Sequence, residues 1–253
     1  MSKKPKVAFF DFTGCEGCQL CAVDLTPEQL FDLLALVDIV EFREVMTDKA
    51  ESYDIAFIEG SISRKPDEEK IKDIRARSKL LVTLGACSTI AGVNALRNFY
   101  PDDKLLHLVY PGHPEIDRTT IARGVSEVVK VDAMIPGCPI DTHEFLRVVK
   151  DLLLGKKPEI PTYPVCVECK MNENTCVYEK GIHCLGPVIR AGCNAICPSN
   201  GGYCFGCRGA IPKANIESMK EILQKYNLSA ADALDKFKLF LERDKEIFPD
   251  DKN

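Results

Sequence analysis

The stretch VAFFDFTGCEGC, residues 7–18, joins an apolar run to two cysteines through a turn that contains glycine. The run Val7–Phe12 has the length and the aromatic and branched side chains of a buried β-strand. Two other stretches repeat the arrangement, LLVTLGAC at 80–87 and AMIPGC at 133–138. Open parallel sheets bind their ligands beyond the carboxyl ends of the strands, so this repeated pattern predicts a parallel sheet with a cysteine site at one edge.

Residues 1–157 alternate short apolar runs with amphipathic segments, as βα units do. We expect a helix that starts at Thr26, because Pro27 suits the first helical position and Gln29 completes a capping box. A later helix begins in a similar way at Asp141. The expected strands are Val7–Phe12, Ile39–Val45, Ile55–Gly60, Leu80–Leu84 and Ala133–Ile135. This half of the chain predicts an α/β domain with a doubly wound, flavodoxin-like parallel sheet.

Residues 158–253 have a different texture and are expected to form a second domain. Up to Gly209 the apolar periodicity disappears, and eight cysteines are interleaved with glycine, proline and asparagine. Such a loop-rich segment cannot build much of a hydrocarbon core, so metal binding must supply much of its folding free energy. Helical periodicity then returns, with Ser229 as the cap of a C-terminal helix that we expect to pack against the cysteine-rich segment.

Thirteen cysteines in 253 residues, against four histidines, make thiol chemistry the main question. Disulfides are disfavoured because the count is odd, no export signal is recognisable, and the chain is long enough to build its own core. A net charge of −5 gives no reason to expect nucleic acid as a partner, and no apolar stretch approaches the length of a membrane span. We therefore expect a cytoplasmic protein with metal–thiolate sites.

Four cysteines follow three of the expected strands and should converge at one edge of the sheet. This first set is Cys15, Cys18, Cys87 and Cys138. Four thiolates suit a [4Fe–4S] cluster or a zinc ion. Alone, Cys15 and Cys18 would fit a thioredoxin-like redox pair, but that interpretation leaves the other two unexplained. Cys21, one helical turn after Cys18, is better explained as a small buried hydrophobe than as a ligand.

The eight remaining cysteines divide into two sets of four. The second set, in PVCVECKMNENTCVYEKGIHC at 164–184, is Cys166, Cys169, Cys176 and Cys184. The third set, in GCNAICPSNGGYCFGC at 192–207, is Cys193, Cys197, Cys204 and Cys207. Neither has the paired C-x2-C knuckles typical of zinc ribbons, so iron–sulfur clusters are favoured.

Three ligand sets without a nucleotide-binding loop or a nucleophile elbow indicate an electron-transfer protein. The alternative that stays open is a zinc-stabilised interaction module, with four cysteines to each zinc ion and no redox activity.

The chain resembles the small, electron-transfer subunit of [NiFe] hydrogenases, and most closely the delta subunit of cytoplasmic, NAD(P)-linked sulfhydrogenases. The stretches that carry the resemblance are GCEGCQL at 14–20, DIAFIEGSIS at 54–63, LGAC at 84–87, PGCP at 136–139, YPVCVEC at 163–169, CLGPVIRAGCNAICP at 184–198 and CFGCRGAI at 204–211. A complex I subunit of similar fold is a poorer match, because it has adjacent cysteines in its first loop and lacks the second cysteine segment.

This resemblance implies three [4Fe–4S] clusters: a proximal one on the first set, a distal one on the second set and a medial one on the third. Its implied partners are a [NiFe] hydrogenase large subunit, which holds the nickel–iron centre, and a flavin- and NAD(P)-binding or ferredoxin-like subunit. Periplasmic members have His-x-x-Cys where this chain has Cys166 and Cys169, and only three cysteines where Cys197 adds a fourth. Nickel-binding motifs are absent from the sequence, so we expect a hydrogenase subunit without the catalytic site.

Overall fold

The computed structural model describes residues 4–113 and 119–244. By its internal contacts the chain divides into two compact units, unit 1 (Met1–Pro158) and unit 2 (Glu159–Asn253). In the described ranges, no helix is both long and apolar enough to cross a membrane.

Unit 1 is built on a five-stranded parallel sheet in the order β2-β1-β3-β4-β5, which is the order of flavodoxin-type folds, so the predicted fold class is confirmed. Its strands are β1 (Lys6–Asp11), β2 (Asp38–Phe42), β3 (Tyr53–Glu59), β4 (Ser78–Leu84) and β5 (Ala133–Ile135). The largest departure from expectation is the end of β2, which stops at Phe42 and not at Val45. The amides of Val45 and Met46 both donate to the Phe42 carbonyl, so the chain turns there.

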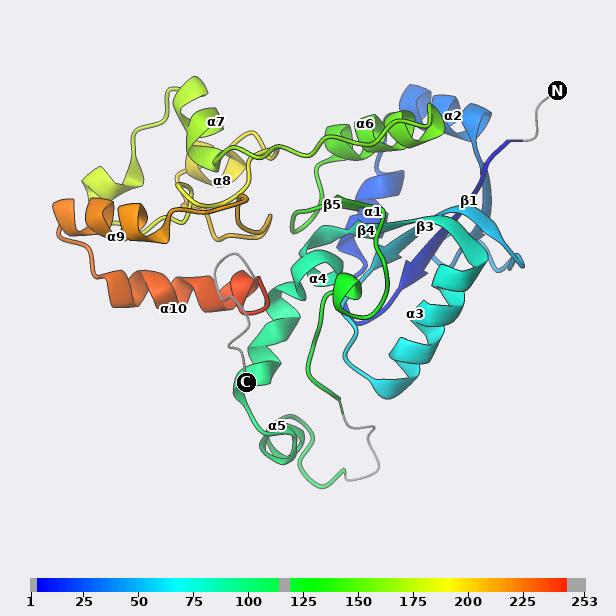
Figure 1. Ribbon diagram of the computed structural model, residues 1–253, viewed down its shortest axis with the longest axis horizontal. Helices are drawn as coiled ribbons and strands as arrows, with labels where there is room; N and C mark the ends of the chain where they lie inside the picture. Colours follow the sequence, from blue (N-terminus) through cyan, green and yellow to red (C-terminus); the bar gives the residue numbers. More distant parts are fainter. Residues whose placement is uncertain (1–3, 114–118, 245–253) are drawn as a thin grey trace. The chain divides into compact units, whose positions relative to one another are not determined.

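Helices of unit 1 cover both faces of the sheet, with α2 and α6 on one face and α3 on the other (Figure 1). They are α1 (Gly17–Val23), α2 (Pro27–Leu36), α3 (Lys65–Arg77), α4 (Gly85–Ile90), α5 (Asp102–Val109) and α6 (Thr142–Leu153), with 3-10 helices η1 (Gly92–Phe99) and η2 (Val125–Glu127). The predicted caps are present: Thr26 accepts the Gln29 amide, and Asp141 accepts the Glu144 amide at 2.8 Å. Helix α1, which carries Cys18, was not among the expected elements.

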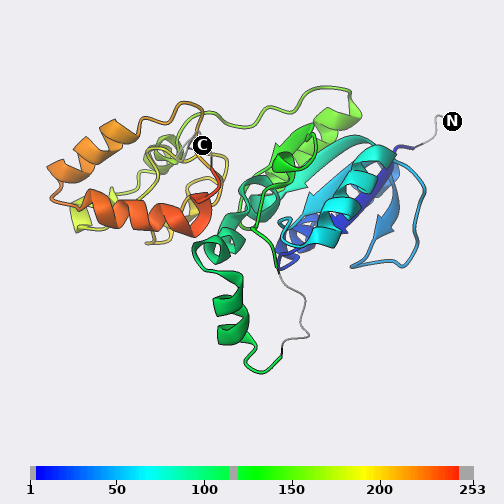
Figure 2. The same ribbon diagram turned by 60° about the horizontal axis from the view of Figure 1, so that its bottom comes forward.

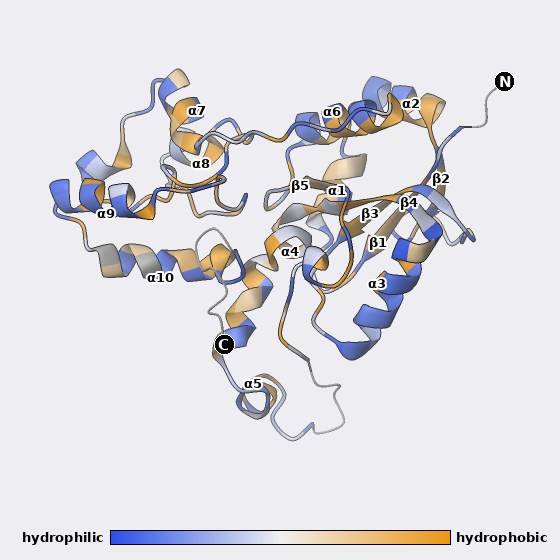
Figure 3. Ribbon diagram, in the orientation of Figure 1, coloured by the Kyte–Doolittle hydropathy of each residue, from blue (hydrophilic) through white to orange (hydrophobic). Residues whose placement is uncertain are grey.

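The core of unit 1 follows from the alternation of side chains along the strands. On the α6 face, Phe9 stacks on Phe42 and Phe57, with ring centroids 4.3 and 4.9 Å apart, and Phe145 of α6 lies beside them. On the other face, Phe10 belongs to the cluster that packs against α3. Figure 3 shows the outcome, because the strands are hydrophobic and α3 is largely hydrophilic.

Unit 2 is rich in loops and has no strand of its own in the part that the structure describes. Its helices are α7 (Val165–Met171), η3 (Val177–Lys180), α8 (Ile196–Ser199), α9 (Ile216–Lys225) and α10 (Ala230–Leu241). Helices α9 and α10 run beside each other (Figure 1, Figure 2) and contribute Leu223 and Phe237, which are fully buried. A Cβ on Gly206 would lie 3.1 Å from Leu241 and 3.3 Å from Leu185, so α10 packs directly on the cysteine-rich segment.

Candidate metal centres

The carboxyl ends of four strands lie level with one another in unit 1. Asp11 of β1 pairs with Glu59 of β3, which in turn pairs with Leu84 of β4. Leu84 pairs with Ile135 of β5. The loops that carry the first set leave the sheet from this single row, so they emerge at the same edge.

Gly85 lies where these three loops meet. Its φ is +82°, and a Cβ at this position would collide with Sγ of Cys18 and come within 3.4 Å of the Gly137 carbonyl oxygen. The amide of Ala86 donates to the same carbonyl at 2.6 Å. Only glycine fits here, and the loops that follow β1, β4 and β5 are in direct contact.

The thiols of the first set act on one another electrostatically. Burial, and then the neighbouring Cys138 and Cys15, raise the pKa of Cys87 to about 12. Burial and Cys15 also raise the pKa of Cys138. Burial, followed by the Glu59 carboxylate, raises the pKa of Cys18 further. These three thiols are therefore protonated at neutral pH in the protein alone, and binding of a metal centre must displace the protons.

Glu59 holds the helix that carries Cys18. Its two carboxylate oxygens accept the amides of Cys18 and Gln19 at 3.0 and 2.8 Å, in the first turn of α1. Burial raises the pKa of Glu59, a residue that is only 4% exposed. The sequence prediction missed this residue; the signal was a carboxylate at the end of the apolar run IAFIEG, because acidic residues are seldom buried without a partner.

Cys21 lies on α1 and is half-buried, whereas the sequence predicted a buried residue. Burial, and then the nearby Asp24 and Glu59, raise the pKa of its thiol. All thirteen cysteines of the chain are free.

The second set comes together in unit 2 around Gly186. A Cβ on this glycine would lie 3.2 Å from Sγ of Cys166 and 3.4 Å from Sγ of Cys184. Burial, and then the other three members in the order Cys184, Cys169 and Cys176, raise the pKa of Cys166 to about 12. All four predicted members of this set are therefore neighbours.

The third set is brought together less completely. Cys204 is almost fully buried, and burial, with Cys184, Cys207 and Cys193 among its neighbours, raises the pKa of its thiol. Its amide donates to Sγ of Cys184 at 3.2 Å, so Cys204 lies beside the second set as well. For Cys197 the structure gives burial as the cause of a raised pKa and no interaction with another member.

Two charged side chains shift the pKa of Cys193, a member of the third set, in opposite senses. Burial raises the pKa of Cys193, the Arg208 guanidinium lowers it, and the Glu168 carboxylate raises it. Arg208 is 3% exposed and donates from Nε to the Ala191 carbonyl at 2.8 Å.

His183, the histidine beside Cys184, contacts a backbone group. Its Nε2 donates to the carbonyl of Ser229, the N-cap of α10, at 2.9 Å and so connects the cysteine-rich segment to that helix.

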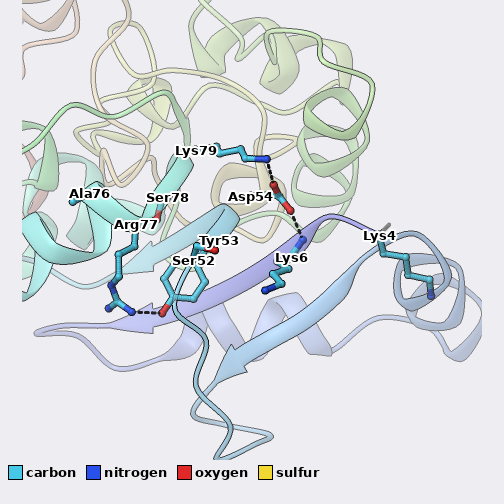
Figure 4. Close-up of a pocket in the computed structure, with 9 residues that line it drawn as sticks. All are labelled: Lys4, Lys6, Ser52, Tyr53, Asp54, Ala76, Arg77, Ser78 and Lys79. Atoms are coloured by element: carbon cyan, nitrogen blue, oxygen red, sulfur yellow. Dashed lines mark hydrogen bonds and ion pairs between the residues drawn. The ribbon is translucent and has the colours of Figure 1, made fainter. Parts of the chain in front are cut away.

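A pocket of about 420 Å³ lies at the opposite edge of the sheet from the first set, at the starts of β1, β3 and β4 (Figure 4). Four of its nine lining residues are cationic, and the carboxylate of Asp54 pairs with Lys79 and accepts the amide of Lys6. No member of the three cysteine sets lines it.

The donor sets fit iron–sulfur clusters by their chemistry, since each offers four thiols; ten of the twelve are partly or fully buried, and Cys15 and Cys138 of the first set are exposed. Among the described residues, no group of three or more histidine, cysteine, aspartate or glutamate side chains is arranged to hold a metal ion. A [4Fe–4S] cluster makes a different demand, because each thiolate binds its own iron atom and the sulfurs surround a cage.

A model of the family described as NADH ubiquinone oxidoreductase, 20 Kd subunit, matches residues 15–152, which hold the first set. Over 223 residues the chain is also 39% identical to sulfhydrogenase 2 subunit delta of Pyrococcus furiosus, covering 87% of this chain and 92% of that one. The chain belongs to the hydrogenase small subunits of this family. The predicted resemblance is confirmed.

Other hydrogenase relatives agree. One subunit of the F420-non-reducing hydrogenase of Methanocaldococcus jannaschii is 32% identical over 241 residues, which cover 83% of each chain. A crystal structure of an NAD+-reducing [NiFe]-hydrogenase in the H2-reduced state matches with a TM-score of 0.58 and 28% identity, covering 63% of this chain and 96% of that one. Small subunits of this family bind iron–sulfur clusters and belong to oxidoreductases that act on H2.

Proposed function

We propose that the chain is the electron-transfer small subunit of a cytoplasmic [NiFe] hydrogenase. The first set holds a proximal, the third set a medial and the second set a distal [4Fe–4S] cluster. When bound, these clusters supply one-electron chemistry that connects the nickel–iron site of a large-subunit partner with a flavin- and NAD(P)-binding or ferredoxin-like subunit.

The observation that carries this proposal is the meeting of three loops at Gly85. Loops from β1, β4 and β5 converge there on thiols that raise one another's pKa. A redox pair made of neighbouring cysteines needs one loop and leaves Cys87 and Cys138 unexplained, whereas a cage of four ligands accounts for all three loops. The hydrogenase relatives supply the reaction to which such a site belongs.

The residues around the thiols do three things for the proposed clusters. They exclude water, as the burial of Cys18 and Cys204 indicates. They orient the ligands, as Glu59 does for α1. They also donate hydrogen bonds to sulfur, as the amide of Cys204 does to Cys184, and such bonds tune the potential of a cluster.

The test compares two identical substitutions in the assembled complex. Cys87→Ser removes a proposed ligand, so the complex should lose about four of the about twelve iron atoms that this chain binds, the proximal electron paramagnetic resonance signal and most H2-dependent dye reduction. Cys21→Ser changes a cysteine outside the three sets and should leave all three readouts at wild-type levels. Full dye reduction by Cys87→Ser would contradict the proximal assignment, and a colourless wild-type complex without iron and sulfide would sink the proposed function.

A further inference from the structure

One side chain connects the second set with the third. Glu168 stands between two proposed ligands of the second set, in the stretch CVEC at 166–169. Both oxygens of its carboxylate accept hydrogen bonds from the backbone: one from the amide of Gly192 at 2.6 Å and the other from the amide of Ala195 at 3.1 Å. These two amides flank Cys193, the first member of the third set.

The loop that Glu168 holds has an unusual backbone. Gly192, Asn194 and Ala195 have φ values of +109°, +52° and +47°. Left-handed backbone is unfavourable for residues other than glycine, so this loop needs an outside partner to keep its shape. Successive residues of this kind turn their amides into a concave site for an anion, and here the anion is the Glu168 carboxylate.

A second contact from the same helix supports the first. Asn172, the C-cap residue directly after α7, follows Glu168 by four residues, so both side chains lie on one side of the helix. Its Nδ2 donates to the Asn194 carbonyl at 2.8 Å. Helix α7 therefore holds the loop around Cys193 from two points, one charged and one neutral.

We infer that Glu168 is a positioning residue for the medial cluster: it fixes the loop that presents Cys193 and places a negative charge beside the third set. The inference rests on the proposed function and adds a residue that is not a ligand. A fixed negative charge disfavours the more negative, reduced state of a cluster, so Glu168 lowers the potential of the medial cluster relative to a neutral residue at this position.

The decisive experiment is Glu168→Gln in the assembled complex, followed by a potentiometric titration monitored by electron paramagnetic resonance. The amide keeps one acceptor oxygen but loses the charge and presents N–H groups to a backbone donor. We expect the third-set signal, identified by its loss in Cys207→Ser, to move to a more positive potential while the other two stay in place. We also expect cluster retention against an iron chelator to fall about 10-fold.

Two further variants distinguish the effect of the Glu168 charge from the effect of the hydrogen bonds that fix the loop around Cys193. Glu168→Asp keeps the charge, so the potential should stay nearer to that of the wild type than in Glu168→Gln. Asn172→Ala removes the neutral contact, so retention of the third-set cluster should fall without a shift in potential. The matched control is Glu179→Gln, which removes an exposed negative charge from the same unit and should change neither readout.

The inference is overturned if Glu168→Gln leaves both potential and retention unchanged, or if Asp and Gln shift the potential equally. Equal loss of the second and third clusters in both Glu168→Gln and Asn172→Ala also overturns it, because that pattern indicates general unfolding of unit 2. Iron missing from the wild-type complex would instead overturn the proposed function itself.

Discussion

The two units hold cysteines together by different means. In unit 1 the hydrophobic core lies between the sheet and its helices, and fully buried side chains such as Phe57 and Ile71 belong to elements that carry no cysteine. In unit 2 the buried thiols of Cys184 and Cys204, 9% and 8% exposed, belong to a loop-rich segment that forms no sheet within the described ranges. Cys18 of unit 1 is buried as deeply, at 7%, but it lies at one end of a sheet that has its own hydrocarbon core. Unit 1 can therefore form its fold first and bind metal at its edge, whereas the fold of unit 2 depends on what its thiols bind.

Removal of the metal should show this difference most strongly. When iron is chelated anaerobically, we expect unit 2 to become sensitive to proteolysis within residues 159–209 while unit 1 stays resistant. A loss of only about 1.4 kcal/mol of stabilisation raises the open population about 10-fold, so cleavage should accelerate at least that much. Limited proteolysis with mass spectrometry locates the cuts. Equal acceleration in both units would refute the contrast.

The next largest effect should come from Gly85→Ala, which acts on unit 1 alone. The new Cβ collides with Sγ of Cys18, so the variant should lose the proximal signal and about four of about twelve iron atoms. Gly155→Ala is the matched control, because Gly155 also has a positive φ, +67°, but has nothing within 4 Å of the added Cβ. It should cost about 1–2 kcal/mol of backbone strain and no iron. Loss of iron from both variants would mean that strain, and not the collision, is responsible.

Gly186→Ala is the counterpart in unit 2 and should have a smaller effect. Its Cβ would lie 3.2 and 3.4 Å from Sγ of Cys166 and Cys184, which is tight but not a collision. We expect a changed line shape or potential for the distal signal with iron content largely retained. Gly201→Ala, which meets nothing within 4 Å, should leave the spectrum unchanged. A complete loss of the distal cluster would show that the thiols of the second set cannot shift to accommodate the added Cβ, as we expect for Cys18 in unit 1.

The smallest effect should come from a charge in unit 1 that is remote in function from the thiols. Although burial alone raises the pKa of Asp132, the Leu81 amide and the Arg75 guanidinium lower it below its ordinary value of 3.8. The stabilisation is therefore present above pH 3.8 and is lost as pH falls through the lower folded value. Asp132→Asn should cost about 1–2 kcal/mol at neutral pH and nothing in strong acid.

Urea unfolding of the full chain followed by circular dichroism, between neutral and acid pH, measures this dependence. The control is Asp73→Asn, since the Asp73 side chain is 62% exposed in its ion pair with Arg77 and should matter by less than about 1 kcal/mol. A penalty for Asp132→Asn that does not fade in acid would show that the carboxylate charge is not the cause.

Those features that depend on local patterns could be predicted from the sequence. Strand positions, the caps at Thr26 and Asp141, and the convergence of three strand ends follow from residues close together in the chain. The partners of Glu59 and Glu168 could not be predicted, because they are backbone amides distant in the sequence and every residue other than proline offers one; only the place of Glu59 at the end of an apolar run marked it as a buried carboxylate. The third set was predicted from spacing alone, and Cys197 remains the member whose placement beside the others is a prediction.

Strand β5 has a consequence for the order in which the protein is made. It is the last strand of the sheet along the described chain, where β4 is its one neighbouring strand, and the loop of Cys138 follows it. At about 5–20 residues per second, a ribosome needs roughly 6–25 s to travel from Cys15 to Cys138. During that interval the growing chain has an incomplete first set, because Cys138 has not yet been synthesised. Delivery of the proximal cluster must therefore wait until translation has passed the edge strand, and the pairing of three residues decides when the protein becomes ready to receive its iron.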